Sequence, residues 1–521
     1  MKDTFKKNLR IHFREYCNHT SVHGFQYLGE KNRHVVERIW WFLVFVICLA
    51  ACITSIWAVY KKWEGSPVIV NFANTLTPIY QIPFPAVTIC PEAKSNQKIF
   101  NFTQVMQNME DGIPLNLSDE ARFEYMSLIC NHYPELNYTN NDTFSDDFYD
   151  VLRTVTPEFQ ILNCSFLDSL TDKCAEFFVP IVTEEGVCYT FNILEAKEIY
   201  KDTVLSFNDY HRRSNLNLQN RTSWSLQEGY SESAGLSPYP LRAYLAGAKN
   251  GLTLTILTVN EDLDYACKDS LQGYRVILHT PMTIPRPSQK YFRIPLDQSV
   301  IGAIEPVMIT TSNRVKGYKS ERRKCFFSFE RELRYFKNYT ASNCNLECLT
   351  NYTLEMCGCV DFYMPRENGT KICGTGNIEC MKIAEGVMHE IHLSVQIDDE
   401  KSFKKFDCNC LSVCSDLTYA VETSQINYEW KNMGSARRSL PRVSANSHLS
   451  TLTLFFKSES FITSERNELY GPLDFISNFG GLLGLFTGFS ILSLMEMVYF
   501  MSIRILCNIR LFGRWSGAEK E

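Results

Sequence analysis

The sequence predicts a two-pass α-helical membrane protein with a large, disulfide-rich α+β domain between the two spans. Three observations lead to this fold class. Two strongly apolar stretches lie near the ends of the 521-residue chain, most of its 20 cysteines lie between them, and strand-like and helix-like patterns share that region. We therefore expect a cytoplasmic amino terminus (1–38), a first span (39–60), an extracellular domain (61–471), a second span (472–502) and a cytoplasmic carboxyl terminus (503–521).

The first span runs from Ile39 to Tyr60 and carries no formal charge. A helix of about 20 apolar residues crosses the hydrocarbon core of a bilayer. Tryptophans lie near both ends of the stretch, as in the aromatic belts of membrane helices. The stretch starts too far into the chain for a cleaved signal peptide and is long for a buried helix of a soluble protein. We interpret it as an uncleaved anchor.

The charges that flank the spans predict the orientation of the chain. Residues 1–38 hold eight Lys and Arg against four Asp and Glu, and residues 503–521 hold four against two. Segments next to a span that are rich in Lys and Arg tend to stay in the cytoplasm. Both termini are therefore predicted to be cytoplasmic, and residues 61–471 to be extracellular.

The cysteines of the middle region predict a disulfide framework, because an even number of cysteines in an exported domain usually pairs. Close spacings such as Cys357 to Cys359 leave zinc binding open, but an oxidising compartment disfavours free thiolates, so we predict no metal site. Nine Asn-x-Ser/Thr sequons in this region agree with an extracellular location. They begin at Asn101, Asn116, Asn137, Asn141, Asn163, Asn220, Asn338, Asn351 and Asn368.

The middle region also predicts a mixed α and β domain. Strand-like patterns occur at 86–89, 252–259, 274–279, 307–311 and 451–456, and helix-like patterns at 119–129 and 330–337. The stretch 252–259 reads LTLTILTV, in which apolar residues largely alternate with threonine. Ten cysteines crowd between Cys325 and Cys414, which indicates that this part depends on disulfides as well as on an apolar core.

The second span has a face of small residues. Ser477, Gly481, Gly484 and Gly488 follow a 4-3-4 spacing, which places them on one side of a continuous helix. Small residues let helix backbones approach closely in membranes. Tight packing against the first span, without a pore, is one explanation of this face.

Polar residues in the second span favour a different explanation. Asp474 and Asn478 lie near its outer end, and Ser490, Ser493 and Glu496 lie toward its inner end. Ionisable groups inside a membrane usually face a helix bundle or a water-filled path, and rings of carbonyls and carboxylates form cation pores. The span is therefore predicted to line a cation pore built from several copies.

Motifs along the chain resemble those of the epithelial sodium channel, degenerin and acid-sensing channel family, most closely its insect pickpocket branch. The resemblance rests on their order and on the enclosing topology. The motifs are His23-Gly24, Phe84–Cys90 (FPAVTIC), Gly186–Asn192 (GVCYTFN), Asn343–Cys348 (NCNLEC), Cys357–Pro365 (CGCVDFYMP), Ile372–Gly374 (ICG), Cys408–Cys414 (CNCLSVC) and the glycine-rich second span.

The resemblance implies a hand-like ectodomain with palm, finger and thumb regions, and a trimer whose second spans line the pore. It assigns the selectivity filter to Gly488, Phe489 and Ser490, where the family usually has a small residue in place of Phe489. Bulky residues at the position of Ser477 hold such channels open, and pore blockers bind near it. The remaining pore and gating residues that we assign are Asn478, Gly481, Gly484, Glu496, His23 and Gly24.

The resemblance also implies seven disulfides, and the two cysteines that remain, Cys130 and Cys267, are expected to form an eighth. The implied pairs are Cys90–Cys188, Cys164–Cys174, Cys325–Cys414, Cys344–Cys410, Cys348–Cys408, Cys357–Cys380 and Cys359–Cys373.

The predicted protein is a subunit of a trimeric, amiloride-sensitive, sodium-permeable cation channel of the plasma membrane, gated by an extracellular stimulus in sensory or epithelial cells. Its partners are sodium ions, identical or related subunits and the lipid bilayer, with no nucleic acid. No catalytic residue and no cofactor are predicted. The alternatives are a two-pass cell-surface receptor similar to scavenger receptors and an ATP-gated trimer, which would need a cluster of lysines. The basic pairs 212–213, 322–323 and 437–438 are either solvated loops or sites of proteolysis.

Overall fold

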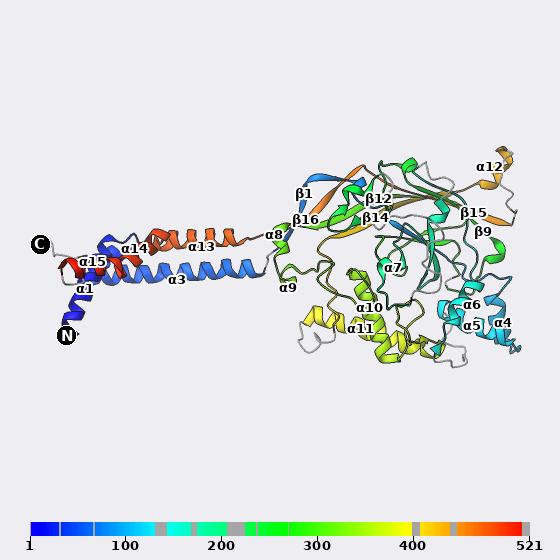
Figure 1. Ribbon diagram of the computed structural model, residues 1–521, viewed down its shortest axis with the longest axis horizontal. Helices are drawn as coiled ribbons and strands as arrows, with labels where there is room; N and C mark the ends of the chain where they lie inside the picture. Colours follow the sequence, from blue (N-terminus) through cyan, green and yellow to red (C-terminus); the bar gives the residue numbers. More distant parts are fainter. Residues whose placement is uncertain are drawn as a thin grey trace. The chain divides into compact units, whose positions relative to one another are not determined.

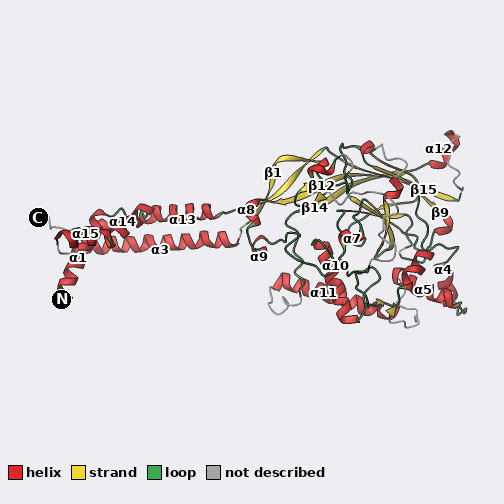
Figure 2. Cartoon of the chain, in the orientation of Figure 1, coloured by secondary structure: helices red, strands yellow, loops and turns green. Residues whose placement is uncertain are grey.

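The computed structural model describes residues 2–30, 33–65, 68–130, 143–167, 174–205, 224–235, 238–268, 270–398, 407–437, 444 and 446–512. These residues form two compact units. The first comprises Met1–Val70, Ser312–Arg323 and Arg466–Glu521, and the second comprises Asn71–Thr311 and Lys324–Glu465. Long helices dominate the first unit and strands the second (Figures 1 and 2).

The first unit joins the two ends of the chain. Its helix α3 (Val35–Gly65) contains the predicted first span and extends beyond it at both ends. The other helices are α1 (Lys2–His19), α2 (Phe25–Gly29), α8 (Asn313–Lys316), α9 (Ser320–Arg323), α13 (Pro472–Thr487), α14 (Ile491–Met501) and α15 (Ile503–Phe512).

The second span is not one continuous helix, and the prediction that Gly488 extends the small face of a single helix was wrong. Helix α13 begins where Pro472 follows Gly471, whose N–H donates to the Asp474 carboxylate at 3.0 Å. It ends because Gly488 adopts a left-handed conformation with φ of 66°. The chain then restarts as α14 after Ser490.

Two sheets form the frame of the second unit. The larger runs in the order β1-β16-β12-β15-β9-β4 with β14 beside β12, and the smaller runs β11-β10-β2-β6-β5. The strands are β1 (Val68–Pro78), β2 (Ala86–Pro91), β4 (Gln160–Phe166), β5 (Phe178–Thr183), β6 (Gly186–Phe191), β9 (Leu252–Val259), β10 (Tyr274–His279), β11 (Phe292–Ile294), β12 (Gln298–Thr311), β14 (Asp416–Asn427), β15 (Ser447–Phe456) and β16 (Ser460–Glu468).

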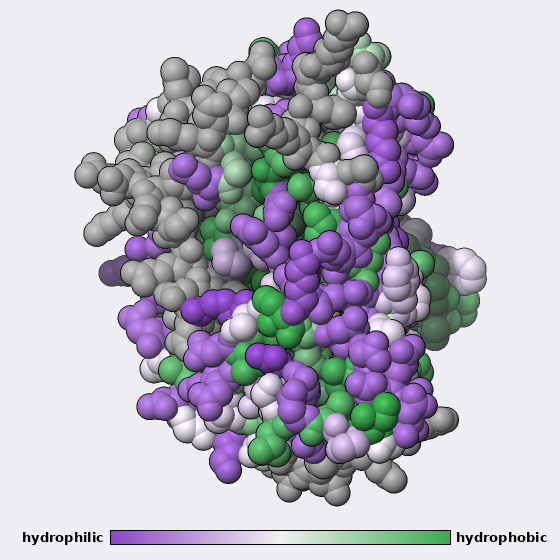
Figure 3. Space-filling view, turned by 90° about the vertical axis from the view of Figure 1, so that its right-hand side faces the viewer, coloured by the Kyte–Doolittle hydropathy of each residue, from purple (hydrophilic) through white to green (hydrophobic). Residues whose placement is uncertain are grey.

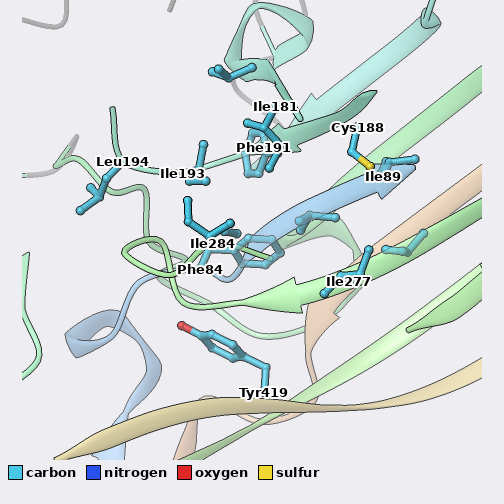
Figure 4. Close-up of a cluster of buried hydrophobic side chains, with 14 of the residues drawn as sticks. Phe84, Ile89, Ile181, Cys188, Phe191, Ile193, Leu194, Ile277, Ile284 and Tyr419 are labelled. Carbon is cyan, nitrogen blue, oxygen red and sulfur yellow. The ribbon is translucent and has the colours of Figure 1, made fainter. Parts of the chain in front are cut away.

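The five predicted strands are confirmed, and the pattern of β9 shows why. Leu252, Leu254 and Ile256 are fully buried, whereas the threonines between them are half-buried. A strand alternates its side chains between two faces, so the apolar set points into the core. The same core takes in Phe84, whose ring lies 5.1 Å from that of Phe166 (Figure 4).

Short helices surround these sheets. They are α4 (Phe102–Glu110), α5 (Leu117–Cys130), α6 (Asp147–Val155), α7 (Ala196–Ile199), α10 (Ala341–Cys357), α11 (Ile378–Asp398) and α12 (Trp430–Arg437), and two-residue strands β3 (Thr143–Phe144), β7 (Trp224–Ser225), β8 (Gly229–Tyr230) and β13 (Ile372–Cys373) complete the unit. The predicted helix 119–129 is α5. Figure 3 shows one face of the structure, where hydrophilic side chains surround smaller groups of hydrophobic ones.

The predicted helix 330–337 is absent from the structure, so that prediction was wrong. Leu333, Tyr335 and Phe336 are buried around an exposed Arg334, and no helical turn forms over residues 330–337. The N–H of Lys337 donates to the Ile199 carbonyl at 2.9 Å, which gives the segment a backbone partner outside itself.

Candidate functional site at the break in the second span

Three residues separate the two halves of the second span: Gly488, Phe489 and Ser490, the predicted selectivity filter. The Ser490 hydroxyl accepts from the Ser493 N–H at 3.2 Å, and the Ser490 N–H donates to the Ser493 hydroxyl at 3.1 Å. These bonds cap the start of α14. The backbone between the caps lies outside both helices, in the middle of an otherwise apolar segment.

The amino-terminal segment lies against this break. The His23 N–H donates to the Thr487 carbonyl at 3.0 Å, which satisfies one of the carbonyls that the end of α13 leaves unpaired. A Cβ added to Gly488 would lie 2.7 Å from Cγ of the His23 ring. Gly24 turns the chain at this point with φ of 86°. The structure therefore brings the predicted His23-Gly24 pair and the predicted filter together.

Ser21 makes a second link to the same region, and the sequence analysis missed it. Its N–H and its hydroxyl both donate to Oε2 of Glu496 at 3.1 Å. Its Oγ lies 2.6 Å from Oγ of Ser493, a fully buried side chain at the start of α14. No spacing in the sequence relates residue 21 to residues 493 and 496, so only the fold reveals this contact.

Helix α1 fixes the amino-terminal segment to the carboxyl-terminal end of the second span. The His12 Nε2 lies 3.0 Å from the Phe500 carbonyl oxygen, and His12 is buried. The Arg504 guanidinium donates to Oε1 of Glu15 from Nη2 at 2.6 Å and from Nε at 3.0 Å. Two donors from one planar group set the orientation as well as the distance.

Helix α13, the first half of the second span, presents two different faces. Phe475 packs against the end of α3, with its ring 5.3 Å from that of Trp63. A helix turns about 100° per residue, so Gly484 lies about 180° around the helix from Phe475. A Cβ placed on Gly481 or Gly484 would meet no other described atom within 4 Å. These glycines therefore do not serve the packing of α13 against α3 in the part of the chain that the structure describes.

The other two residues assigned to this half of the span, Ser477 and Asn478, are both exposed. Ser477 lies about 200° around the helix from Phe475. The side-chain amide of Asn478 donates to the Asp474 carbonyl at 2.9 Å. Both side chains are accessible to a neighbouring chain or to solvent.

One of the three basic pairs is part of the first unit and is not a solvated loop. The Arg322 guanidinium lies between the rings of Trp63 and Tyr318, at 4.4 and 4.5 Å, and donates to the Trp63 carbonyl at 3.2 Å. Arg323 is buried. The Tyr318 hydroxyl donates to Glu468, and burial together with that carboxylate raises the pKa of Tyr318 to about 12. The pairs 212–213 and 437–438 include residues outside the described part of the chain.

The second unit contains eight disulfides, which join the same partners that the sequence analysis expected: Cys90–Cys188, Cys130–Cys267, Cys164–Cys174, Cys325–Cys414, Cys344–Cys410, Cys348–Cys408, Cys357–Cys380 and Cys359–Cys373. Six sequon asparagines are described, and none is buried: Asn101, Asn116, Asn163, Asn338, Asn351 and Asn368. Asn137, Asn141 and Asn220 lie outside the described residues. Among the residues that the structure covers, no group of three His, Cys, Asp or Glu side chains is arranged to hold a metal ion.

These features define a class of membrane protein. Two helical segments, Val35–Gly65 and Ile491–Leu511, have the length and mean hydropathy (2.6 and 1.4) of membrane spans. The break Gly488–Ser490 directly precedes the second of these segments. Non-helical backbone at membrane depth is tolerated only inside protein or beside a water-filled cavity. The fold and the site are those of a two-span membrane protein with a disulfide-rich domain between the spans, and the break suits a channel or transporter.

The comparisons with known proteins narrow this class to one family. The model of the amiloride-sensitive sodium channel family matches residues 16–500. The chain belongs to this family, whose members are ion channels rather than enzymes.

Several relatives match over nearly the whole chain. Pickpocket protein 28 of Drosophila melanogaster is 28% identical over 95% of this chain and 79% of its own. Sodium channel protein Nach of the same species is 23% identical over 96% and 89%, and acid-sensing ion channel 1C of Danio rerio is 22% identical over 92% and 82%. A solved structure titled as a proton-activated chloride channel covers 89% of this chain and 96% of its own at 6% identity, with a TM-score of 0.27, which is too low to support any statement about the fold.

Proposed function

We propose that the chain is a subunit of a trimeric, sodium-permeable and amiloride-sensitive cation channel of the plasma membrane, opened by a stimulus that acts on its extracellular domain. Both termini are cytoplasmic in this proposal, and residues 39–60 and 472–502 cross the bilayer. The trimer contains identical or related subunits. The names of two relatives, sodium channel protein Nach and acid-sensing ion channel 1C, support the class of ion and opening by a stimulus.

The observation that carries the proposal is the small face of α13. Gly481 and Gly484 have open space where side chains would lie, although a bare glycine costs a helix about 1 kcal/mol relative to alanine. Small residues let helices or hydrated ions approach the backbone closely. A pore lined by this face of α13 from several copies explains why glycine stands at these positions, and the packing of the single chain does not explain it.

The filter in this proposal is the non-helical segment Gly488–Ser490. Its backbone carbonyls are the groups that would replace the water around a sodium ion. Phe489, which is half-buried, is larger than the residue usual in the family. Glu496 follows the filter on helix α14, where its carboxylate supplies negative charge for a cation that leaves the filter.

The structure sharpens the experiment that separates a channel from a receptor without a pore. Replacement of Gly488 is uninformative, because its positive φ and its contact with His23 make it necessary to the single chain. Gly484→Leu is the better test, because the single chain leaves room for the added side chain. Ile476→Phe, which adds bulk on an exposed but different part of α13, is the matched control.

We expect membrane current from the unmodified chain, alone or with related subunits, and a loss of at least tenfold in Gly484→Leu at equal surface expression. The control should keep its current. Ser477→Phe should increase current, because bulk at this position holds related channels open. Equal behaviour of Gly484→Leu and the unmodified chain, or no current from surface protein under any of these conditions, would favour the receptor.

A further inference from the structure

The second unit contains a cavity of about 320 Å³ that the proposed pore does not use. Its walls come from helices α10 and α11, whose places in the chain Figure 1 shows, from residues 286–289 after β10, and from Asp407, Cys408 and Cys410. Arg286 lines one side, and Glu385, His389 and His392 of α11 line another. A cavity of this volume is in the range of small-molecule sites.

Arg286 has few partners for a side chain that is only 12% exposed. Its Nη2 lies 3.5 Å from Oε2 of Glu184, which is its one ionic partner among the described residues, and its Nε is buried without an acceptor. Oε1 of Glu184 accepts instead from the Ser288 N–H at 2.6 Å. A guanidinium has five N–H donors, and a shielded charge with unused donors is costly. The side of the cavity that Arg286 lines thus offers an anion a strong partner.

The wall formed by α11 and Asp407 has the opposite character. Oε1 of Glu385 lies 3.7 Å from Nε2 of His389, and Oδ1 of Asp407 lies 3.2 Å from Nδ1 of His392. Each carboxylate thus faces an imidazole. Oδ2 of Asp407 also accepts from the Asn409 N–H at 3.2 Å and retains one further lone pair, whereas the second oxygen of Glu385 is the more open acceptor of this wall. Met388 adds apolar surface to the same cavity. An ammonium group is the natural partner of this wall.

We propose that this cavity binds a small zwitterion of the α-amino-acid class, with its carboxylate on Arg286 and its ammonium group toward Glu385 and Asp407. Arg286 suits this role because a planar guanidinium donates two parallel bonds to a carboxylate. The ligand would bridge α11 and the segment after β10. Binding is independent of the pore, and only its effect on gating would rest on the proposed channel function.

The test measures binding to the purified full chain rather than current, so that failure of the channel proposal does not affect it. The probes are L-phenylalanine and L-phenylalaninamide, which share the ammonium group and the ring but differ in the carboxylate. We expect the acid to bind at least tenfold more tightly than the amide, because only the acid places a charged acceptor on the Arg286 guanidinium.

Variants of Arg286 then locate the site. Arg286→Gln should weaken L-phenylalanine binding at least tenfold and Arg286→Lys by less, whereas Lys249→Gln, an exposed cation elsewhere on the unit, should change nothing. The comparison of acid and amide needs no variant, so it stands even if Arg286→Gln fails to fold. Equal binding of the two probes, binding of neither, or full binding by a folded Arg286→Gln would overturn the proposal.

Discussion

Replacement of Gly488 by alanine tests the geometry of the break most directly. Gly488 has φ of 66°, a conformation that an L side chain disfavours by about 1–2 kcal/mol. The new Cβ would also lie 2.7–2.8 Å from three atoms of the His23 ring. These atoms lie close to the backbone of His23, so the ring cannot avoid the contact by a small rotation of its far end.

The two effects differ in origin and add. Overpacking of this kind costs about 1–3 kcal/mol, and with the backbone strain the total is at least about 2 kcal/mol. A change of about 2 kcal/mol shifts an equilibrium about 30-fold. We therefore expect Gly488→Ala to lower the population of the functional arrangement of the break by at least this factor.

The assay is the current per surface channel, measured under voltage clamp and normalised to surface-labelled protein. His23→Ala, Gly488→Ala and the double variant form a double-mutant cycle. We expect His23→Ala to relieve the steric part of the Gly488→Ala defect, about tenfold, and to leave the part that comes from backbone strain.

Two results would refute this reasoning. If Gly488→Ala conducts like the unmodified chain, the break does not need a left-handed residue. If the effects of His23→Ala and Gly488→Ala are simply additive, the His23 ring does not contact Gly488 in the functional state, and the amino-terminal segment takes another position.

Three further predictions concern other contacts. Ser21→Ala removes a hydroxyl that donates to the Glu496 carboxylate, and a hydrogen bond to a charged group contributes about 1.5 kcal/mol. We therefore expect the preference of the channel for sodium over potassium to change in Ser21→Ala but not in the control Ser21→Thr, which keeps the hydroxyl. An unchanged reversal potential in Ser21→Ala would contradict this expectation. Burial, with help from nearby carboxylates, raises the pKa of Asp361 from 3.8 to about 7, so its charge lowers stability as pH rises across that range. Asp361→Asn should reduce this loss of unfolding free energy by about 2 kcal/mol, which is half of what the full pKa shift would give, because the residue is partly exposed. Equal unfolding curves at pH 4.5 and 7.5 in both proteins would contradict this. Cys130→Ser should lower the unfolding free energy of the second unit by about 2–5 kcal/mol and leave Cys267 open to alkylation. Replacement of both Cys130 and Cys267 should destabilise the unit no further. A Cys267 that reacts in the unmodified chain would refute the pairing.

The strands were predictable because their burial follows directly from the residues. In β9 Leu252, Leu254 and Ile256 are fully buried and the threonines between them are half-buried, so over this stretch the alternation in the sequence gives the two faces of the strand directly. The segment 330–337 failed for the opposite reason. Its charged and aromatic residues suit a helix, but a contact with Ile199, more than 130 residues earlier, supplies one of its backbone partners.

The sequence contains residues that indicate the break in the second span, but the apolar pattern around them favours a continuous helix. Glycine just after a helix and serine just before one are common terminators, and Gly488 and Ser490 stand in those two roles. A count of apolar residues passes over them, because hydropathy stays high on both sides of the break. The bonds of Ser21 to Ser493 and Glu496 left no such signal, since they join residues more than 470 positions apart.

The glycines of the second span therefore separate into two kinds that sequence spacing cannot distinguish. Gly488 is required by the chain itself, because its φ and the His23 ring exclude a side chain whether or not a pore exists. Gly481 and Gly484 have ordinary helical geometry and empty space around them. If a larger residue at these two positions impairs function, the cause lies outside the single chain, either in neighbouring copies or in ions and water in a shared path. A loss of current in Gly484→Leu would thus be evidence for an assembly of several copies. A loss of current in Gly488→Leu would not be, because the single chain already excludes a side chain there.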